Sequence, residues 1–147
     1  MKKFKMCWPS LGLEVICEGI GQNKAVLDTF IANMPAKALQ GHEMVGGKIL
    51  RDRAVRMGKQ PFGEEVRAAA TEKLKDAPIG RVVLLSPYGN GTELLVKYED
   101  CVDDRDYIPV AQVHERDLPA LEKAGKAAWR SATREQQIII VEFTEVE

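Results

Sequence analysis

The residues most suited to chemistry lie together between positions 40 and 53. This stretch holds one of the two histidines, His42, beside a carboxylate, Glu43, and it ends with two arginines, Arg51 and Arg53. Imidazole and carboxylate groups are common proton carriers in enzymes, and guanidinium groups bind carboxylates through paired hydrogen bonds. The stretch therefore predicts a site that binds an acidic small molecule and transfers protons.

Three glycines shape this stretch. Adjacent residues of a regular strand point to opposite faces, so His42 and Glu43 can share one substrate only where the backbone bends. Gly41, Gly46 and Gly47 permit such a bend, because glycine adopts positive φ and lets another group approach closely. The alternative is that His42 only satisfies hydrogen bonds of its neighbours, as buried polar side chains commonly do. Which of His42 and Glu43 faces the site stays open at this point.

The two arginines are spaced for joint binding. Arg51 and Arg53 are two residues apart, so on an extended segment both side chains lie on one face. Such a fork suits a carboxylate or a phosphate. The alternative is a solvated strand edge that carries charges only to stay soluble.

Three further side chains complete the candidate site. We assign Tyr88, in the loop beside a turn at Asn90 and Gly91, to the catalytic group, and Tyr98 and Asp103 to substrate binding. The acidic stretch 99–107 lacks the ligand pattern of a calcium loop, so a solvated loop is the alternative for Asp103. We expect no metal and no cofactor in the site.

The elements that must position these residues are mostly strands. Alternating or continuous apolar runs bounded by glycine, proline and asparagine predict about eight strands, mainly in hairpins. The expected strands are 4–8, 13–20, 36–45, 48–55, 81–85, 93–98, 107–113 and 135–146. Hairpins in this number favour closure into a barrel, which removes exposed sheet edges, so the expected fold class is mainly β.

Helical patterns occupy three places between the strands. Residues 23–35 carry apolar side chains at helical spacing after Asn23, which is a suitable N-cap. A short helix is expected over 117–124, capped by Asp117 and ended by Gly125.

The third helix is expected over 64–76, within an insertion at about 62–77. Its composition of Glu, Ala, Lys and Arg favours a helix, but its apolar face is narrow. Such a helix would lie outside the barrel, either as part of a homodimer interface through Ala68, Ala69 and Ala70 or as a lid over the arginines.

Composition and charge bound the class of protein. The chain has 147 residues, of which 45% are hydrophobic and 29% charged, which fits one domain over 1–147. The formal net charge of −1 disfavours a nucleic-acid surface, which would normally be basic. The three cysteines form no C-x-x-C pair, and with two distant histidines they do not make a zinc site.

Targeting signals are expected to be absent. The lysine-rich start could open a signal peptide, but Pro9 and Ser10 interrupt the apolar run that should follow. The longest apolar run, 138–141, is far below the roughly 20 residues of a membrane-spanning helix. We therefore expect a cytoplasmic protein without membrane contact.

Several stretches together resemble a known family. Residues 23–35, the corner at 41–43, the end of the strand at Tyr98, the stretch 108–113 and the strand segment 137–143 resemble, in pattern and order, small bacterial proteins with a cyclophilin-like barrel. Within that group the chain looks most like the cucumopine-synthase-related proteins. The resemblance covers most of the chain except 64–76, and it implies a closed cyclophilin-like barrel.

The resemblance also implies an activity. Cucumopine synthase condenses an amine, histidine, with a 2-oxo acid through an imine and ring closure, a Pictet–Spengler type of reaction. In that scheme Arg51 and Arg53 hold a substrate carboxylate, while His42 or Glu43 moves protons. The same groups also suit hydrolysis of a cyclic amide, and a non-enzymatic ligand-binding protein is the third alternative. The arginine followed by a Phe-x-Met segment that marks prolyl isomerases has no match here, so prolyl isomerase activity is not expected.

Overall fold

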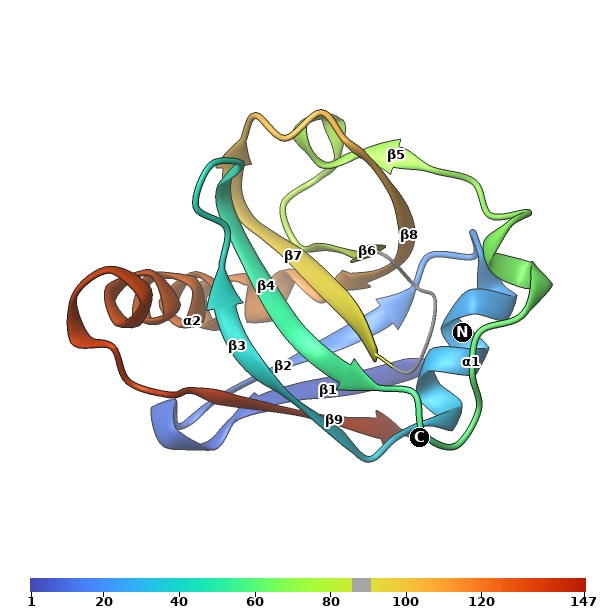
Figure 1. Ribbon diagram of the computed structural model, residues 1–147, viewed down its shortest axis with the longest axis horizontal. Helices are drawn as coiled ribbons and strands as arrows, with labels where there is room; N and C mark the ends of the chain where they lie inside the picture. The colour runs from blue at the N-terminus through green and yellow to red at the C-terminus, as the bar shows by residue number, and fades with distance from the viewer. Residues whose placement is uncertain (86–90) are drawn as a thin grey trace.

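Eight antiparallel strands close into a barrel in the computed structural model, which describes residues 1–85 and 91–147 (Figure 1). Neighbouring strands follow the order β2-β1-β9-β3-β4-β7-β6-β8, and pairing of β2 with β8 closes the ring. The strands are β1 (Lys3–Trp8), β2 (Leu13–Gly19), β3 (Ala36–His42), β4 (Gly47–Arg56), β6 (Arg81–Leu85), β7 (Gly91–Cys101), β8 (Asp106–Val113) and β9 (Ile140–Val146). A short strand, β5 (Glu72–Lys73), pairs with β8 outside the ring. The expected mainly β, closed barrel of about eight strands is confirmed.

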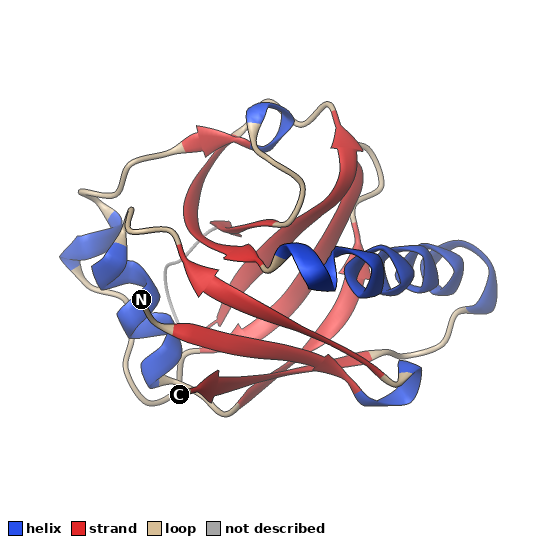
Figure 2. Cartoon of the chain, turned by 180° about the vertical axis from the view of Figure 1, so that it is seen from behind, coloured by secondary structure: helices blue, strands red, loops and turns tan. Residues whose placement is uncertain are grey.

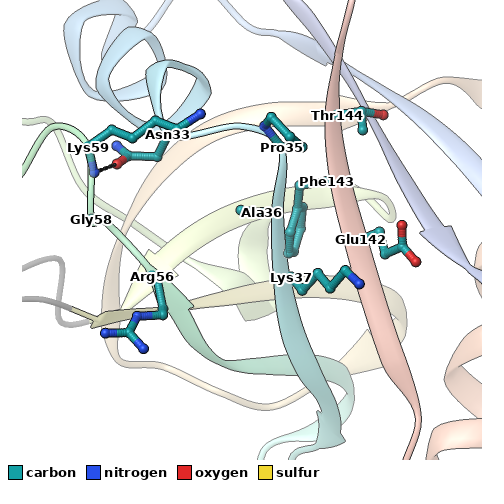
Figure 3. A pocket seen from close by; sticks show the side chains of 10 residues that line it. All are labelled: Asn33, Pro35, Ala36, Lys37, Arg56, Gly58, Lys59, Glu142, Phe143 and Thr144. Atoms are coloured by element: carbon teal, nitrogen blue, oxygen red, sulfur yellow. Dashed lines mark hydrogen bonds between the residues drawn. The ribbon is translucent and has the colours of Figure 1, made fainter.

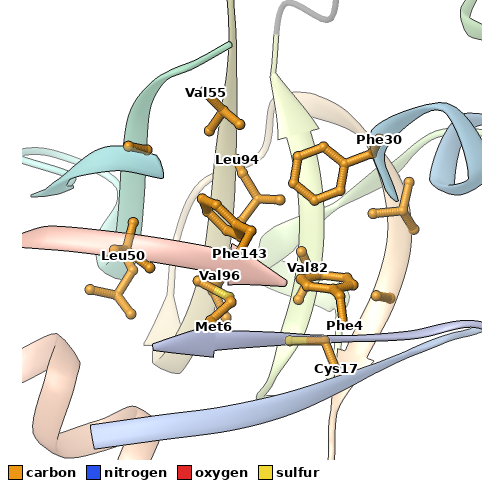
Figure 4. Close-up of a cluster of buried hydrophobic side chains, with 14 of the residues drawn as sticks. Phe4, Met6, Cys17, Phe30, Leu50, Val55, Val82, Leu94, Val96 and Phe143 are labelled. Atoms are coloured by element: carbon orange, nitrogen blue, oxygen red, sulfur yellow. The ribbon is translucent and has the colours of Figure 1, made fainter. Parts of the chain in front are cut away.

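The barrel interior is filled by apolar side chains from every wall (Figure 4). Phe4, Phe30 and Phe143 form an aromatic cluster, with the Phe30 ring centroid 5.6 Å from each of the other two. All three are almost completely buried. Burial of each such side chain contributes about 1.5–3 kcal/mol, so the interior is a packed core and not a channel.

Two α-helices flank the barrel on different sides, α1 (Lys24–Ala32) and α2 (Leu118–Arg130) (Figure 2). The remaining helical pieces are single turns: η1 (Pro9–Leu11), η2 (Glu64–Val66), η3 (Leu74–Asp76), η4 (Glu115–Asp117) and the π-type turn η5 (Ser131–Glu135). Helix α1 buries Val26, Leu27 and Phe30 against the strands, as its apolar spacing predicts.

Asn23 and Asp117 stand at the expected N-cap positions of α1 and α2, but neither side chain makes a capping hydrogen bond. Asn23 has a left-handed backbone with φ of 54°, and its amide instead bonds both backbone groups of Ala70 and the carbonyl of Pro109. The Asp117 carboxylate accepts a hydrogen bond from the backbone of Ile16 at 2.9 Å. Both side chains therefore tie distant segments together, and these long-range bonds replace the local caps that their positions suggest.

The expected helix over 64–76 does not form. Val66 is buried in the main core, and Leu74 is wholly buried in a second cluster on the outer face of the barrel. Between them, Asn23 holds Ala70, and Glu72 pairs with β8. These tertiary contacts need an extended path, and they outweigh the modest helix propensity of the segment.

Two expectations lose their basis with that helix. The segment cannot present a helical alanine face to a second subunit, so the homodimer stays a prediction without support from this element. Nor does a helix lie over the arginines, because Glu65 at the start of the segment bonds Thr29 of α1 instead.

The last helix is longer than expected, because Gly125 lies inside α2 and does not end it. A Cβ atom at Gly125 would lie 2.5 Å from ring atoms of Tyr98, which is closer than real side chains approach. Glycine is therefore required here because the helix packs closely on β7, and it does not terminate the helix as expected.

Candidate functional site

A hollow of about 240 Å³ opens where the β3–β4 turn meets the end of α2. It is lined by His42, Glu43, Met44, Val45, Gly47, Lys48 and Trp129. The turn expected at Gly46 and Gly47 is confirmed, and it is what brings both His42 and Glu43 to one hollow.

Glu43 is the hub of the polar groups beside this hollow. Its side chain is only 4% exposed, and its Oε1 atom accepts from Arg51 Nη1 at 3.0 Å and from Arg105 Nη2 at 3.3 Å. Over residues 1–85 and 91–147, no hydrogen bond engages the second oxygen, Oε2. The two guanidinium groups therefore fix the carboxylate through Oε1, and Oε2 keeps no hydrogen-bond partner among the described residues.

Each arginine is held in turn by a second carboxylate. Arg51 donates to Glu93 Oε2 from Nε at 3.0 Å and from Nη2 at 2.5 Å. Arg105 donates to Asp103 Oδ2 at 2.7 Å, and this hydrogen bond raises the pKa of Arg105 above its ordinary value. Both guanidinium groups are therefore cationic supports whose positions are fixed before any substrate arrives.

Asp103 supports the network and does not carry protons. Burial raises the pKa of this carboxyl, but hydrogen bonds from Arg105 and Tyr107 outweigh burial and leave the pKa below its ordinary value. The Tyr107 hydroxyl donates to Asp103 Oδ2, and burial raises the pKa of Tyr107. Asp103 therefore stays ionised at neutral pH and anchors Arg105.

His42 has partners at both ring nitrogens. Nδ1 lies 2.6 Å from the carbonyl oxygen of Glu43, and Nε2 lies 2.7 Å from the hydroxyl of Tyr98. A carbonyl only accepts, so Nδ1 carries the proton and Nε2 accepts from the tyrosine. Burial, the largest effect, lowers the pKa of His42, so the ring is neutral at pH 7.

Aromatic rings surround the histidine. The centroids of the Tyr98 and Trp129 rings lie 5.5 Å and 4.8 Å from that of His42. Tyr98 is 3% exposed, and burial raises its pKa to about 12. Trp129 is 41% exposed, so one part of the indole holds His42 while the rest forms a wall of the hollow.

The lowered pKa of His42 predicts a pH dependence of stability. The folded protein favours the neutral ring. The contribution of His42 to the free energy of unfolding is therefore complete above the unfolded pKa of about 6.5, and it is lost as the pH falls toward the folded pKa. Glutamine does not titrate, so we expect the His42→Gln variant to lose less stability than the parent as the pH falls below about 6.5. Urea unfolding midpoints at several pH values measure this difference. An identical pH slope in the variant and the parent would contradict the assignment.

Five of the sequence-assigned residues meet in this cluster: His42, Glu43, Arg51, Tyr98 and Asp103. Arg53 makes no hydrogen bond or ion pair with this cluster within residues 1–85 and 91–147. Its side chain lies over Gly41, where an added Cβ would be 3.0 Å from Arg53 Nε, and it lines a different hollow. Tyr88, assigned to the catalytic group, falls outside the described residues.

Sequence reasoning missed four members of the cluster: Arg105, Tyr107, Glu93 and Trp129. Arg105 carried a weak signal as the single cation in the acidic stretch 99–107. Glu93 and Trp129 carried none, because only the β4–β7 pairing and the long α2 bring them to Arg51 and His42. Over residues 1–85 and 91–147, no group of three or more His, Cys, Asp or Glu side chains is arranged to hold a metal ion.

Comparison with solved structures places the barrel among known folds. A cyclophilin-type peptidyl-prolyl cis-trans isomerase of Cryptosporidium parvum covers 99% of this chain and 98% of its own, with a TM-score of 0.62 and 11% identity. The fold is cyclophilin-like. At this low identity the likeness concerns the fold alone.

A second solved structure is more similar. McbB, whose structure was determined in complex with tryptophan, matches 96% of this chain at a TM-score of 0.81 and 26% identity. The chain spans only 44% of the length of McbB. No protein-family model and no curated protein matches the sequence. No helix in the described part of the chain is long and apolar enough to span a membrane.

Proposed function

We propose that this chain belongs to a small-molecule enzyme that condenses an amino acid with a 2-oxo acid through an imine and ring closure. The observation that carries the proposal is the Glu43 carboxylate: two arginines fix it through Oε1, Oε2 has no hydrogen bond within residues 1–85 and 91–147, and Glu43 lines the hollow. The cucumopine-synthase resemblance and the similarity to McbB in complex with tryptophan, an amino acid with an amine and an aromatic ring, support it.

Glu43 is the proton carrier in this scheme. It first takes a proton from the substrate ammonium, which frees the amine nitrogen to attack the carbonyl carbon of the 2-oxo acid. As the N–C bond forms, one proton passes from the nitrogen to the former carbonyl oxygen and gives the carbinolamine. Glu43 then returns its proton to this hydroxyl, which leaves as water and gives the iminium. The ring carbon attacks the iminium carbon, and Glu43 accepts the proton that the ring loses. Arg51 and Arg105 keep the carboxylate in place through these steps.

The other groups of the hollow bind and position the substrate. The exposed part of Trp129 offers a flat face to an aromatic ring. Lys48, which lines the hollow, and the half-exposed Arg105 are the cations in reach of a substrate carboxylate. His42 acts as a positioning residue, since its Nδ1 donates to the Glu43 backbone and its other nitrogen is taken by Tyr98.

Replacement by lysine is expected to have different effects at Arg51 and at Arg53. Arg51→Lys cannot bridge Glu43 and Glu93 with one ammonium group, so we expect kcat/KM to fall about tenfold through a misplaced carboxylate. Arg53→Lys is the matched control and is expected to leave the kinetics unchanged. Steady-state kinetics measures both variants. An equal loss of kcat/KM in the two would show that Arg53 also takes part in the site.

A product search tests the proposed reaction against its alternatives. The protein is incubated with 2-oxoglutarate and either histidine or tryptophan, and separately with a panel of lactams, and products are followed by mass spectrometry. The proposal expects a product with the mass of the two substrates less one water. A lactam that gains one water would identify a hydrolase instead. Saturable binding of tryptophan without turnover would identify a ligand-binding protein.

A further inference from the structure

A second and larger opening lies at the other end of β3, with a volume of about 450 Å³ (Figure 3). Its walls come from the start of β3, the neighbouring part of β9 and the chain that follows β4. It is lined by Asn33, Pro35, Ala36, Lys37, Arg56, Gly58, Lys59, Glu142, Phe143 and Thr144. We call this opening the β3 slot.

The β3 slot exists because two barrel strands separate. The ladder between β3 and β4 runs only from the pair Leu39 and Arg53 to the pair His42 and Leu50. Beyond it, the start of β3 stays with β9, while the end of β4 stays with β7 after an irregularity. Within that irregularity Ala54 has a φ of 60°, a conformation that alanine rarely adopts. The strained bend turns β4 away from β3 and opens the wall.

One side of the β3 slot is fixed by hydrogen bonds. Asn33 is 4% exposed, and its side-chain oxygen accepts from the backbone nitrogens of Lys59 and Gln60 at 2.9 and 3.0 Å. Its amide nitrogen donates to the carbonyl oxygens of Thr29 and Gln60, each at 2.8 Å. The chain at 59–60 is therefore held at a set distance from β3, and the β3 slot is formed before a ligand enters.

The β3 slot combines an apolar wall with cations that have no partner. Pro35 and Ala36 form the wall, over the buried ring of Phe143 (Figure 3). Of the cations around it, Lys37 and Arg56 make no hydrogen bond or ion pair within residues 1–85 and 91–147. The remaining charged groups are Lys59, which donates to the carbonyl oxygen of Met34, and one acid, Glu142, which lies opposite Lys37 in the β3–β9 register. The balance around the β3 slot is therefore positive.

We propose that the β3 slot is a second small-molecule site, which binds an organic acid with an apolar body. The apolar body lies against Pro35 and Ala36. The Lys37 side chain extends toward Glu142 and the Arg56 side chain extends away from β3 (Figure 3), so both exposed cations turn toward the carboxylate when it binds. Clefts of this size with an apolar wall and a few converging polar groups are typical of ligand sites. An acid satisfies both unpartnered cations, and a neutral molecule of the same shape does not.

This site is separate from the hollow at Glu43. Lys37 and His42 stand near opposite ends of β3, which at about 3.3 Å per residue separates them by roughly 17 Å. The two openings share no lining residue. Ligand binding in the β3 slot can therefore be tested independently of the proposed condensation.

The charge requirement is tested with a matched pair of probes. Indole-3-acetate carries the carboxylate and indole-3-acetamide is its neutral analogue, and the affinity of each is measured by calorimetry. We expect the double variant Lys37→Gln, Arg56→Gln to lose at least about tenfold in affinity for the acid and to bind the amide as the parent does. Lys123→Gln, an exposed lysine on α2, is the control with the same chemistry and should change neither affinity.

The position of the site is tested by filling it. A Cβ added at Gly58 meets nothing within 4 Å and its φ is not in the left-handed region, so Gly58→Phe can be accommodated. Because Gly58 lines the β3 slot, we expect the added ring to narrow the opening. We expect this variant to lose binding of both probes while its thermal unfolding midpoint stays close to that of the parent. Absence of saturable binding of indole-3-acetate to the parent, or equal binding to all variants, would overturn the proposal. Turnover at the Glu43 hollow is read separately and is expected to survive Gly58→Phe.

Discussion

Glu43→Gln is expected to lower kcat for the condensation by at least about 100-fold, the usual contribution of a positioned general acid–base group. Glutamine keeps an oxygen that can accept from Arg51 and Arg105, so the shape of the site is retained while the transferable proton is lost. The folded state should tolerate the change, because Glu93 and Asp103 still hold the two arginines. The check is steady-state kinetics together with the thermal unfolding midpoint.

Glu93→Gln provides the matched control. Glu93 also bonds Arg51, with a side chain that is 26% exposed, but it does not line the hollow. We expect a loss well below that of Glu43→Gln. If the two variants lose equal activity, Glu43 acts only through the position of Arg51, and the role of proton carrier is wrong.

Asp52→Asn is expected to stabilise the protein at neutral pH. Asp52 is wholly buried in the barrel, and neither carboxylate oxygen accepts a hydrogen bond from the described residues. Burial raises the pKa of this carboxyl well above its ordinary value, and the proximity of Gln40 lowers the pKa only in part, since the Gln40 amide donates to the Gly41 carbonyl at 2.7 Å. The gain expected for the variant is the cost of keeping this carboxyl protonated, or of burying its charge, at neutral pH, since asparagine has no charge to bury.

The gain from Asp52→Asn should depend on pH in a defined direction. Because the folded protein favours the protonated carboxyl, the parent keeps its full stability below the unfolded pKa of about 4 and loses it as the pH rises toward the folded pKa. Asparagine does not titrate, so the difference between variant and parent should vanish near pH 4 and grow toward pH 7. Urea unfolding at several pH values measures it. A difference that is constant with pH would show that Asp52 is not held protonated.

The strands could be predicted because their signals are local. Leu50 and Asp52 are buried while Arg53 is exposed, so the alternation of a half-buried strand is visible in β4, with Asp52 as the exception that a pattern of hydrophobic residues cannot place. The helix predicted over 64–76 was wrong because helix propensity has only a weak effect on structure. What decided its path was the burial of Val66 and Leu74 in two different clusters, which no local pattern encodes.

The site was predictable only where its residues are neighbours in sequence. His42, Glu43 and Arg51 follow from one stretch because the glycine turn joins two paired strands. Arg105 and Trp129 arrive from loops and helices more than 50 residues away, and their contacts depend on the closed barrel. Chemistry that is shared between distant segments is therefore the part that sequence reasoning leaves open.

Gly125 limits which sequences this fold can accept. Glycine inside an exposed helix costs about 1 kcal/mol relative to alanine, so a designer who aims to stabilise α2 would replace it first. That exchange would force the helix away from Tyr98, the ring that carries the hydrogen bond to His42. Beyond the first turn of α2, Gly125 is the least helix-favouring residue, and it is the one whose replacement would separate the helix from the site. Variants selected for heat resistance alone would therefore lose the geometry at His42.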